Sequence, residues 1–264
     1  MTAWTRAIGN CSAEVRVGVI DTSVDVSHPS LEGSRITLKT VRSPDRAASD
    51  ANHGTAVVSL LAGTGKLDIV GLAPNALVFS ADAFHKAADD VSADAFDLIQ
   101  GLDWLAQSNV AVINMSLSGP DNTLLKQAIS QVLARHIVIV AAAGRSDRSG
   151  TQGYPSRYEG VIAVSSVDHR LRPVRSTMRG KHISLAAPGV GLVLAGPQGG
   201  TQRVDGTSFA APFVTAAFAL RTRQTTGSVK LMEMLAASAR DLGMPGRDPV
   251  YGWGLVQYSG LPSC

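Results

Sequence analysis

The sequence predicts an α/β fold in which a mostly parallel sheet carries helices on both faces. Three observations support this: predicted helices and strands alternate, the predicted strands are apolar throughout, and one helix is apolar on all sides. Continuously apolar strands are typical of a parallel sheet that is buried on both faces. The 264 residues are 45% apolar, with no change of composition that would divide them, so we expect a single domain over residues 1–264.

The alternation begins with a strand predicted at 15–20, an apolar run that ends abruptly at Asp21 and Thr22. Two helix–strand units follow, because apolar residues at helical spacing precede β-branched runs. They are a helix from Ser92 onward, a strand at 110–117, a helix at 124–133 and a strand at 137–140. Short strands between Gly and Pro breaks are predicted at 161–165, 183–186 and 192–195.

The run at 209–220 is nearly all apolar, which predicts a buried helix. In open α/β sheets, sites form where strands end and helices begin. Three residues with groups suited to acyl transfer stand at such points. They are Asp21 after the first strand, His53 at the start of a run that turns helical, and Ser208 at the mouth of the buried helix.

Together these side chains have the chemistry of an activated nucleophile. A serine hydroxyl is weakly nucleophilic until a base takes its proton, and the base needs a third group to fix its tautomer. A helix start adds N–H donors and a positive dipole end for an oxyanion. Taken singly, Asp21 also fits an Asx turn, His53 a surface histidine and Ser208 an N-cap. Their joint occurrence favours the catalytic interpretation.

The surrounding residues resemble the subtilisin-like serine peptidases, whose motifs occur in the same chain order of Asp, His and Ser. The matching segments are Asp21-Thr22-Ser23 with His28-Pro29 and Leu31, His53-Gly54-Thr55, Asn114-Met115-Ser116-Leu117 with Gly119-Pro120, Ala186-Ala187-Pro188-Gly189, Gly206-Thr207-Ser208 with Ala210 and Pro212, and Tyr251-Gly252-Trp253-Gly254-Leu255. Because the matches extend along most of the chain, accidental agreement is improbable.

The resemblance implies a doubly wound, subtilisin-like sheet and a serine endopeptidase that cuts peptide bonds through an acyl-enzyme. The substrate would be an extended peptide or protein, added as a strand along Ser116, Leu117 and Ser118. Gly153 would form the floor of the main specificity pocket, which predicts a preference for large apolar residues before the cut. A removed prosegment or an inhibitor is a further candidate occupant of the cleft, and we expect a monomer.

One departure from the family concerns the oxyanion position. After Gly144 the family has an asparagine whose amide donates to the oxyanion, and this chain has Arg145. Losing such a donor costs about 2.7 to 4 kcal/mol, while the Ser208 backbone N–H remains. The guanidinium of Arg145 either replaces the amide or faces solvent and leaves a slow enzyme. The alternative function is a pseudoprotease or peptide-binding module with impaired catalysis.

The composition argues against other partners and against cofactors. Lys and Arg number 24 against 21 Asp and Glu, and the net charge of +3 is spread along the chain, which argues against nucleic acid. No apolar run could span a bilayer, so we expect no membrane partner. The segment at 63–68 is short of the oxygen ligands that calcium needs, and the six histidines form no paired zinc motif. We therefore expect no cofactor and no essential metal.

The two cysteines, Cys11 and Cys264, lie near the two ends of the chain, and spacing alone does not pair them. A disulfide between them would suit a processed protein in an oxidising compartment, and two reduced thiols would suit a cytoplasmic one. No signal peptide is visible in the chain as given. We expect a secreted or periplasmic protein, with a cytoplasmic one as the alternative.

Overall fold

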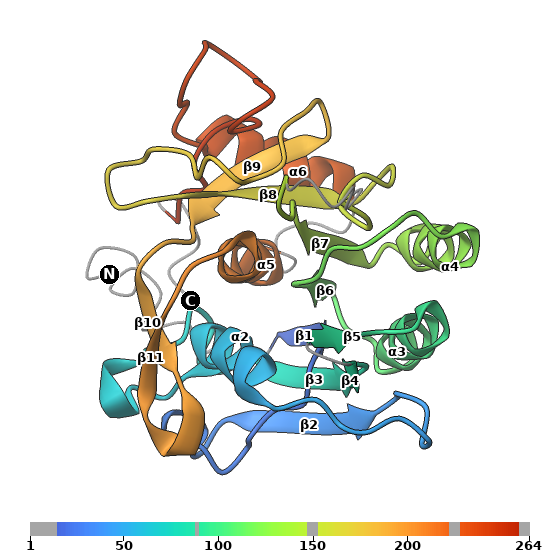
Figure 1. The fold of residues 1–264 in the computed structure, drawn as a ribbon. Coiled ribbons are helices and arrows are strands. Elements are labelled where there is room, and N and C mark those ends of the chain that lie inside the picture. The colour runs from blue at the N-terminus through green and yellow to red at the C-terminus, as the bar shows by residue number, and fades with distance from the viewer. Residues whose placement is uncertain (1–14, 88–89, 147–152, 222–227, 259–264) are drawn as a thin grey trace.

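A computed structural model describes residues 15–87, 90–146, 153–221 and 228–258 (Figure 1). Its centre is a seven-stranded sheet in the order β2-β3-β1-β6-β7-β8-β9, in which every neighbouring pair is parallel. The strands are β1 (Arg16–Asp21), β2 (Arg35–Thr40), β3 (Leu77–Asp82), β6 (Val112–Met115), β7 (Val138–Ala142), β8 (Ile162–Val167) and β9 (Ile183–Pro188). The predicted α/β class with a mostly parallel sheet is confirmed.

Helices cover both faces of the sheet, as Figure 1 shows. α3 (Ala95–Gln107) and α4 (Thr123–Ala134) pack on one face, and α2 (Asn52–Ala62) and α5 (Thr207–Arg221) on the other, where α6 (Ser228–Ser238) joins them. Along β1, Val19 faces the layer of α2 and α5, and Ile20 faces the layer of α3 and α4; both side chains are fully buried. A strand with apolar residues on both sides therefore needs both helical layers.

Several elements differ from the sequence prediction. The predicted strand at 192–195 forms, as β10 (Leu192–Ala195), but it pairs with β11 (Thr201–Val204) as an antiparallel ribbon outside the main sheet. The predicted helix from Ser92 begins at Ala95, because β5 (Asp90–Ser92) pairs with β4 (His85–Ala87). Three short 3-10 helices, at Pro29–Leu31, Lys66–Asp68 and Pro197–Gly199, complete the described elements.

The strand order places the first candidate residue at a reversal of the sheet. β1 lies between β3 and β6, and the chain passes from β3 through α3 to reach β6 on the other side of β1. Ligand sites in open α/β sheets form outside the carboxyl ends of strands at such reversals. Asp21 is the last residue of β1 and therefore stands at that point. None of the described helices is long and apolar enough to cross a membrane.

Candidate active site

Asp21 is held at the end of β1 with its carboxylate turned toward His53. The residue is 2% exposed, and its Oδ1 accepts hydrogen bonds from the backbone N–H of Thr22 at 2.7 Å and from Nδ1 of His53 at 2.6 Å. The other oxygen, Oδ2, is also buried and has no hydrogen-bond partner among the described residues. The short contact to His53 fixes the tautomer, because Nδ1 carries the proton and Nε2 is left free to accept one.

The position of His53 follows from the way the first turn of α2 docks on the end of β1. The backbone N–H of Gly54 donates to Oγ1 of Thr22 at 2.9 Å, which satisfies one of the unpaired N–H groups of the helix start. A Cβ on Gly54 would overlap the carbonyl oxygen of Thr22, so only glycine allows this approach. The ring of His53 also packs against Phe209 of α5, with centroids 5.2 Å apart.

Two opposing influences set the protonation of His53. Burial of the ring lowers its pKa, but the negative charge of Asp21, the hydrogen bond to it and the charge of Asp50 outweigh burial, so the net pKa is raised above 6.5. The side chain remains 35% exposed and open to the cleft. The imidazole of His53 therefore becomes neutral, and able to accept a proton, at a higher pH than an ordinary histidine.

Ser208 lies in the first turn of α5 and is linked to the strand end at Ser116. Its Oγ donates to the Ser116 carbonyl at 3.0 Å, and Oγ of Ser116 donates to the Ser208 carbonyl at 2.6 Å. Neither Ser208 nor Ser116 forms a hydrogen bond with His53. The hydroxyl of Ser208, the candidate nucleophile, is therefore hydrogen-bonded to Ser116, and the predicted hydrogen bond from Ser208 to His53 is not formed. Catalytic hydrogen bonds are often long or absent in structures without substrate.

A buried polar network behind Ser208 was not singled out by sequence reasoning. Nδ2 of Asn114 donates to Oγ of Ser116 at 2.8 Å, and Oγ1 of Thr215 donates to Oδ1 of Asn114 at 2.9 Å. Asn114 and Thr215 are fully buried. The network ties the end of β6 to the middle of α5. The polar residue Asn114 within an otherwise apolar strand was the available signal.

At the oxyanion position, the backbone is ordered around Gly144 while the Arg145 side chain is exposed. The Gly144 N–H donates to Oγ1 of Thr207 at 3.1 Å, and its carbonyl accepts from the N–H of Met178 at 3.1 Å. Arg145 pairs through its backbone with Thr177, and its guanidinium makes no hydrogen bond or ion pair with any described residue. The guanidinium is thus not held toward Ser208 by a described partner.

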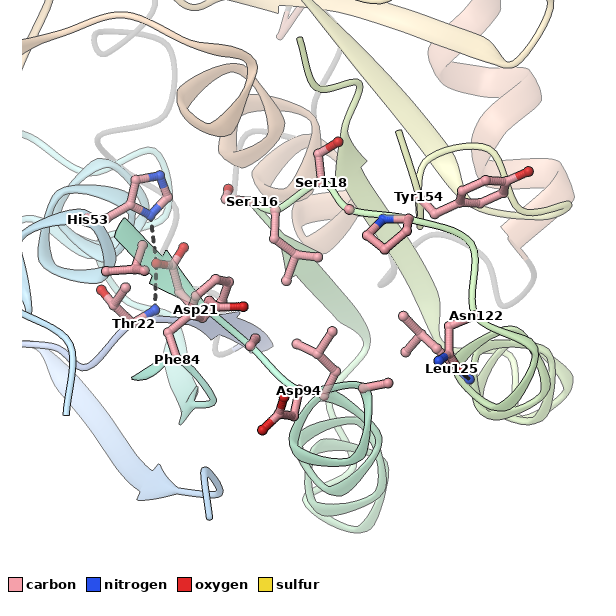
Figure 2. Close-up of a pocket in the computed structure, with 18 of the residues that line it drawn as sticks. Asp21, Thr22, His53, Phe84, Asp94, Ser116, Ser118, Asn122, Leu125 and Tyr154 are labelled. Atoms are coloured by element: carbon pink, nitrogen blue, oxygen red, sulfur yellow. Dashed lines mark hydrogen bonds and ion pairs between the residues drawn. The ribbon is translucent and has the colours of Figure 1, made fainter. Parts of the chain in front are cut away.

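A cleft of about 480 Å³ opens beside these residues (Figure 2). Asp21 and His53 line one end, and the predicted substrate strand, Ser116 to Ser118, lines its wall. Other lining residues are Phe84, Val91, Leu98, Pro120, Leu125 and Tyr154. The lining is mainly apolar, so the cleft suits apolar side chains of an extended chain.

Gly153 is not among the residues that line this cleft, and its place on the floor of the main specificity pocket stays a prediction. A Cβ on Gly153 would overlap Sδ of Met178, and a Cβ on Gly144 would overlap Oγ of Ser118. Met178 and Ser118 therefore pack directly against the backbone of these two glycines. Met178 lies in a loop distant in sequence, so this contact has no local signal.

Cys11 and Cys264 fall outside the described residues.

Comparisons with known proteins show the family to which the chain belongs. The family model described as "Subtilase family" matches residues 12–254. Subtilisin DY of Bacillus licheniformis is 34% identical over 259 residues, which are 95% of this chain and 92% of that protein. Subtilisin E of Bacillus subtilis is 32% identical, over 94% of this chain and 65% of that protein.

Solved structures give the same match. A mutant of the protease domain of PatA superposes with a TM-score of 0.80 at 27% identity, over 94% of this chain and 93% of that one. The self-cleaved form of the same domain superposes at 0.78, with 94% of both chains covered.

Proposed function

Because the chain belongs to the subtilase family and is a serine endopeptidase, we propose that Asp21, His53 and Ser208 form its catalytic triad. The observation that carries the proposal is the 2.6 Å hydrogen bond from Nδ1 of His53 to the buried carboxylate of Asp21. It leaves Nε2 as the acceptor, next to the start of α5, against which the His53 ring packs. Asp21 orients the base, His53 accepts the proton, and Ser208 is the nucleophile.

The acylation step starts with a change of the Ser208 rotamer. Oγ leaves the Ser116 carbonyl and turns to Nε2 of His53, a move between staggered wells. Nε2 takes the hydroxyl proton as Oγ bonds to the substrate carbonyl carbon, and the carbonyl electron pair moves onto oxygen. The Ser208 backbone N–H, at the positive end of α5, stabilises that oxyanion. When the C–N bond breaks, His53 returns the proton to the leaving amine and the acyl-enzyme remains.

Deacylation repeats the same steps with water. Nε2 of His53 takes a proton from water while the water oxygen bonds to the acyl carbon. The bond from that carbon to Oγ of Ser208 then breaks, and the proton returns to Oγ. Asp21 stays ionised throughout and stabilises the positive charge that forms on His53.

A serine-directed phosphonate probe tests the nucleophile directly. We expect the probe to attach to Ser208 in the active protein, located by peptide mass analysis, and to leave Ser208→Ala unlabelled. The Ser208→Ala protein should also lose turnover of a chromogenic peptide. Labelling at another serine, or equal turnover by both proteins, would contradict the triad. Absent labelling and absent turnover in the parent would favour the peptide-binding alternative.

The substrate is proposed to bind as an added strand. Leu117 and Ser118 have no backbone hydrogen bond to any described residue, so their N–H and C=O groups are available to an extended peptide. Gly119 is already paired with Tyr154 in both directions, which marks the end of the free edge. The peptide would therefore run along Leu117 and Ser118 and bring its scissile carbonyl to Ser208.

This geometry changes the expected specificity. The residue before the cut would lie beside Ser208, and we infer that Met178, whose Sδ packs against the backbone of Gly153, narrows the pocket there. Large apolar side chains fit instead in the cleft of about 480 Å³ that Leu117 lines. We therefore propose a small residue directly before the cut and a large apolar residue farther along the peptide.

Met178→Ala tests this specificity. Shortening Met178 frees the space beside Gly153, so we expect kcat/KM for a peptide with Phe before the cut to rise roughly tenfold relative to the matched Ala peptide. The partly buried Met232 of α6 gives the control Met232→Ala, which should leave the ratio unchanged. A parent enzyme that already prefers Phe, with no change in Met178→Ala, would contradict the proposal.

The remaining expectations stay predictions. The self-cleaved PatA domain supports the idea that a segment of a subtilase's own chain can enter such a cleft, and we propose the same class of occupant here. Secretion and a monomeric state also stay predictions.

A further inference from the structure

Three side chains with metal-binding groups meet beside the cleft, outside the proposed triad. They are His85 at the start of β4, Asp94 directly before α3, and Asp97 in the first turn of α3. One ligand atom from each lies within 4.8 Å of the ligand atoms of the other two. The β4–β5 ribbon, which the sequence analysis did not predict, and the start of α3 bring these residues together.

Two of these side chains are buried, and each has one polar atom without a hydrogen-bond partner among the described residues. His85 is 4% exposed and its Nδ1 has no hydrogen bond; Asp97 is 0% exposed and its Oδ2 has none. Buried polar atoms are nearly always satisfied by protein, water or an ion, because an unmet one retains its full desolvation cost. The two unpartnered atoms therefore leave this cluster with binding capacity that the described residues do not satisfy.

The neighbouring side chains engage the cluster only weakly. Among the described residues, Oδ1 of Asp97 accepts a hydrogen bond only from Oγ of Ser43, at 3.2 Å. Asp94 precedes α3 but makes no side-chain cap hydrogen bond, and its one ion pair, with Arg46 at 3.4 Å, joins two half-exposed side chains. Such an exposed pair contributes little and is readily exchanged. The two carboxylates give the cluster a negative charge, and within the described part of the chain Arg46 is the cation that forms an ion pair with it.

The donor set selects the class of ion. Calcium and magnesium take oxygen ligands, and an imidazole nitrogen favours a first-row transition ion. Zinc accepts one histidine and two carboxylates at bond lengths of about 2.0–2.2 Å, which needs an inward movement of about 1 Å from the present spacing. Asp94 also lines the cleft, as Figure 2 shows, so water can reach a fourth coordination position.

We propose that His85, Asp94 and Asp97 bind one zinc ion, which fastens β4 to the start of α3 and so stiffens one wall of the substrate cleft. The prediction of no essential metal depended on the segment at 63–68 and on the absence of a paired histidine motif, and it did not consider residues from two separate elements. The ion has no part in bond cleavage, since it lies outside the proposed triad.

Zinc binding to the full chain tests the site. The chelator-treated Ser208→Ala protein is dialysed against zinc, so that neither self-cleavage nor the proposed function affects the result. We expect one equivalent bound and a higher melting temperature. His85→Asn and Asp97→Asn should bind at least 10- to 100-fold more weakly, the loss typical of even an outer partner. His136, an exposed histidine with φ of 63°, gives the matched control His136→Asn, which should bind like its parent.

A second measurement covers variants that fold poorly. Asp94 is only partly buried, so Asp94→Asn should fold, and cobalt bound in place of zinc should change its visible spectrum relative to the parent. The inference is overturned if the parent binds no zinc, if the three variants bind as tightly as the control, or if the cobalt spectrum of Asp94→Asn matches that of the parent.

Discussion

Arg145→Asn is expected to raise kcat for peptide hydrolysis by roughly 100- to 1,000-fold, the range measured for loss of the corresponding donor in subtilisin itself. The exposed guanidinium of Arg145 has no described partner that would hold it toward Ser208. The backbone around it is anchored, because Gly144 contacts Thr207 and Met178. We expect an amide introduced on that anchored backbone to donate to the oxyanion. Because such a donor acts mainly in the transition state, kcat should change more than KM.

The control for this prediction is Arg170→Asn, which makes the same change of charge on an exposed residue away from the cleft and should leave kcat unchanged. Steady-state kinetics on one chromogenic peptide compares the three proteins. An Arg145→Asn protein with lower kcat would mean that the guanidinium itself serves the oxyanion. An unchanged kcat would mean that residue 145 does not reach the site at all.

Much of the sheet and its helical layers follows from local pattern, but β3, a mostly buried strand inside the sheet, was not predicted. β1 and α5 are apolar through most of their length, so the apolar runs alone predict them. β2 was missed because it lies at the edge of the sheet and most of its residues are exposed. The start of α3 was predicted three residues too early, because Asp90–Ser92 forms a strand that pairs with β4. The local sequence does not indicate that pairing.

At the candidate site, sequence reasoning identified the chemical groups but not their contacts. Asp21 and His53 do meet, because each stands at a strand end or helix start on the same edge of the sheet. The hydrogen bond of Ser208 to Ser116 could not be predicted, because it joins residues 92 positions apart. The same holds for Met178 beside Gly153 and for the cluster of His85 with two aspartates. Each depends on packing between segments that share no local pattern.

Asp21→Asn is expected to lower kcat by roughly 10,000-fold and to move the pH profile. In the parent, His53 must lose its proton to act as a base. Burial lowers the pKa of His53, but Asp21, together with Asp50, raises it by more, so activity should rise with pH through a value above 6.5. The amide removes the charge of Asp21 and its charge-assisted hydrogen bond while burial remains. The residual activity should therefore rise at lower pH than in the parent, measured as kcat/KM across pH. A profile that keeps its position would mean that Asp21 does not set the protonation of His53.

The same shift has a consequence for stability, with a sign that follows from linkage. A histidine whose pKa is higher in the folded than in the unfolded state binds protons more tightly when folded. Its stabilisation is complete below pH 6.5 and is lost as the pH rises through the raised folded value. Asp21→Asn removes two causes that raise the pKa of His53, the charge of Asp21 and the hydrogen bond to it, and leaves burial, which lowers the pKa, and the charge of Asp50, which raises it. Across this pH window the free energy of unfolding of the parent should therefore fall relative to that of the variant, as denaturant titrations at several pH values would measure. If the difference between the two proteins is the same at every pH, the coupling between Asp21 and His53 does not contribute to stability.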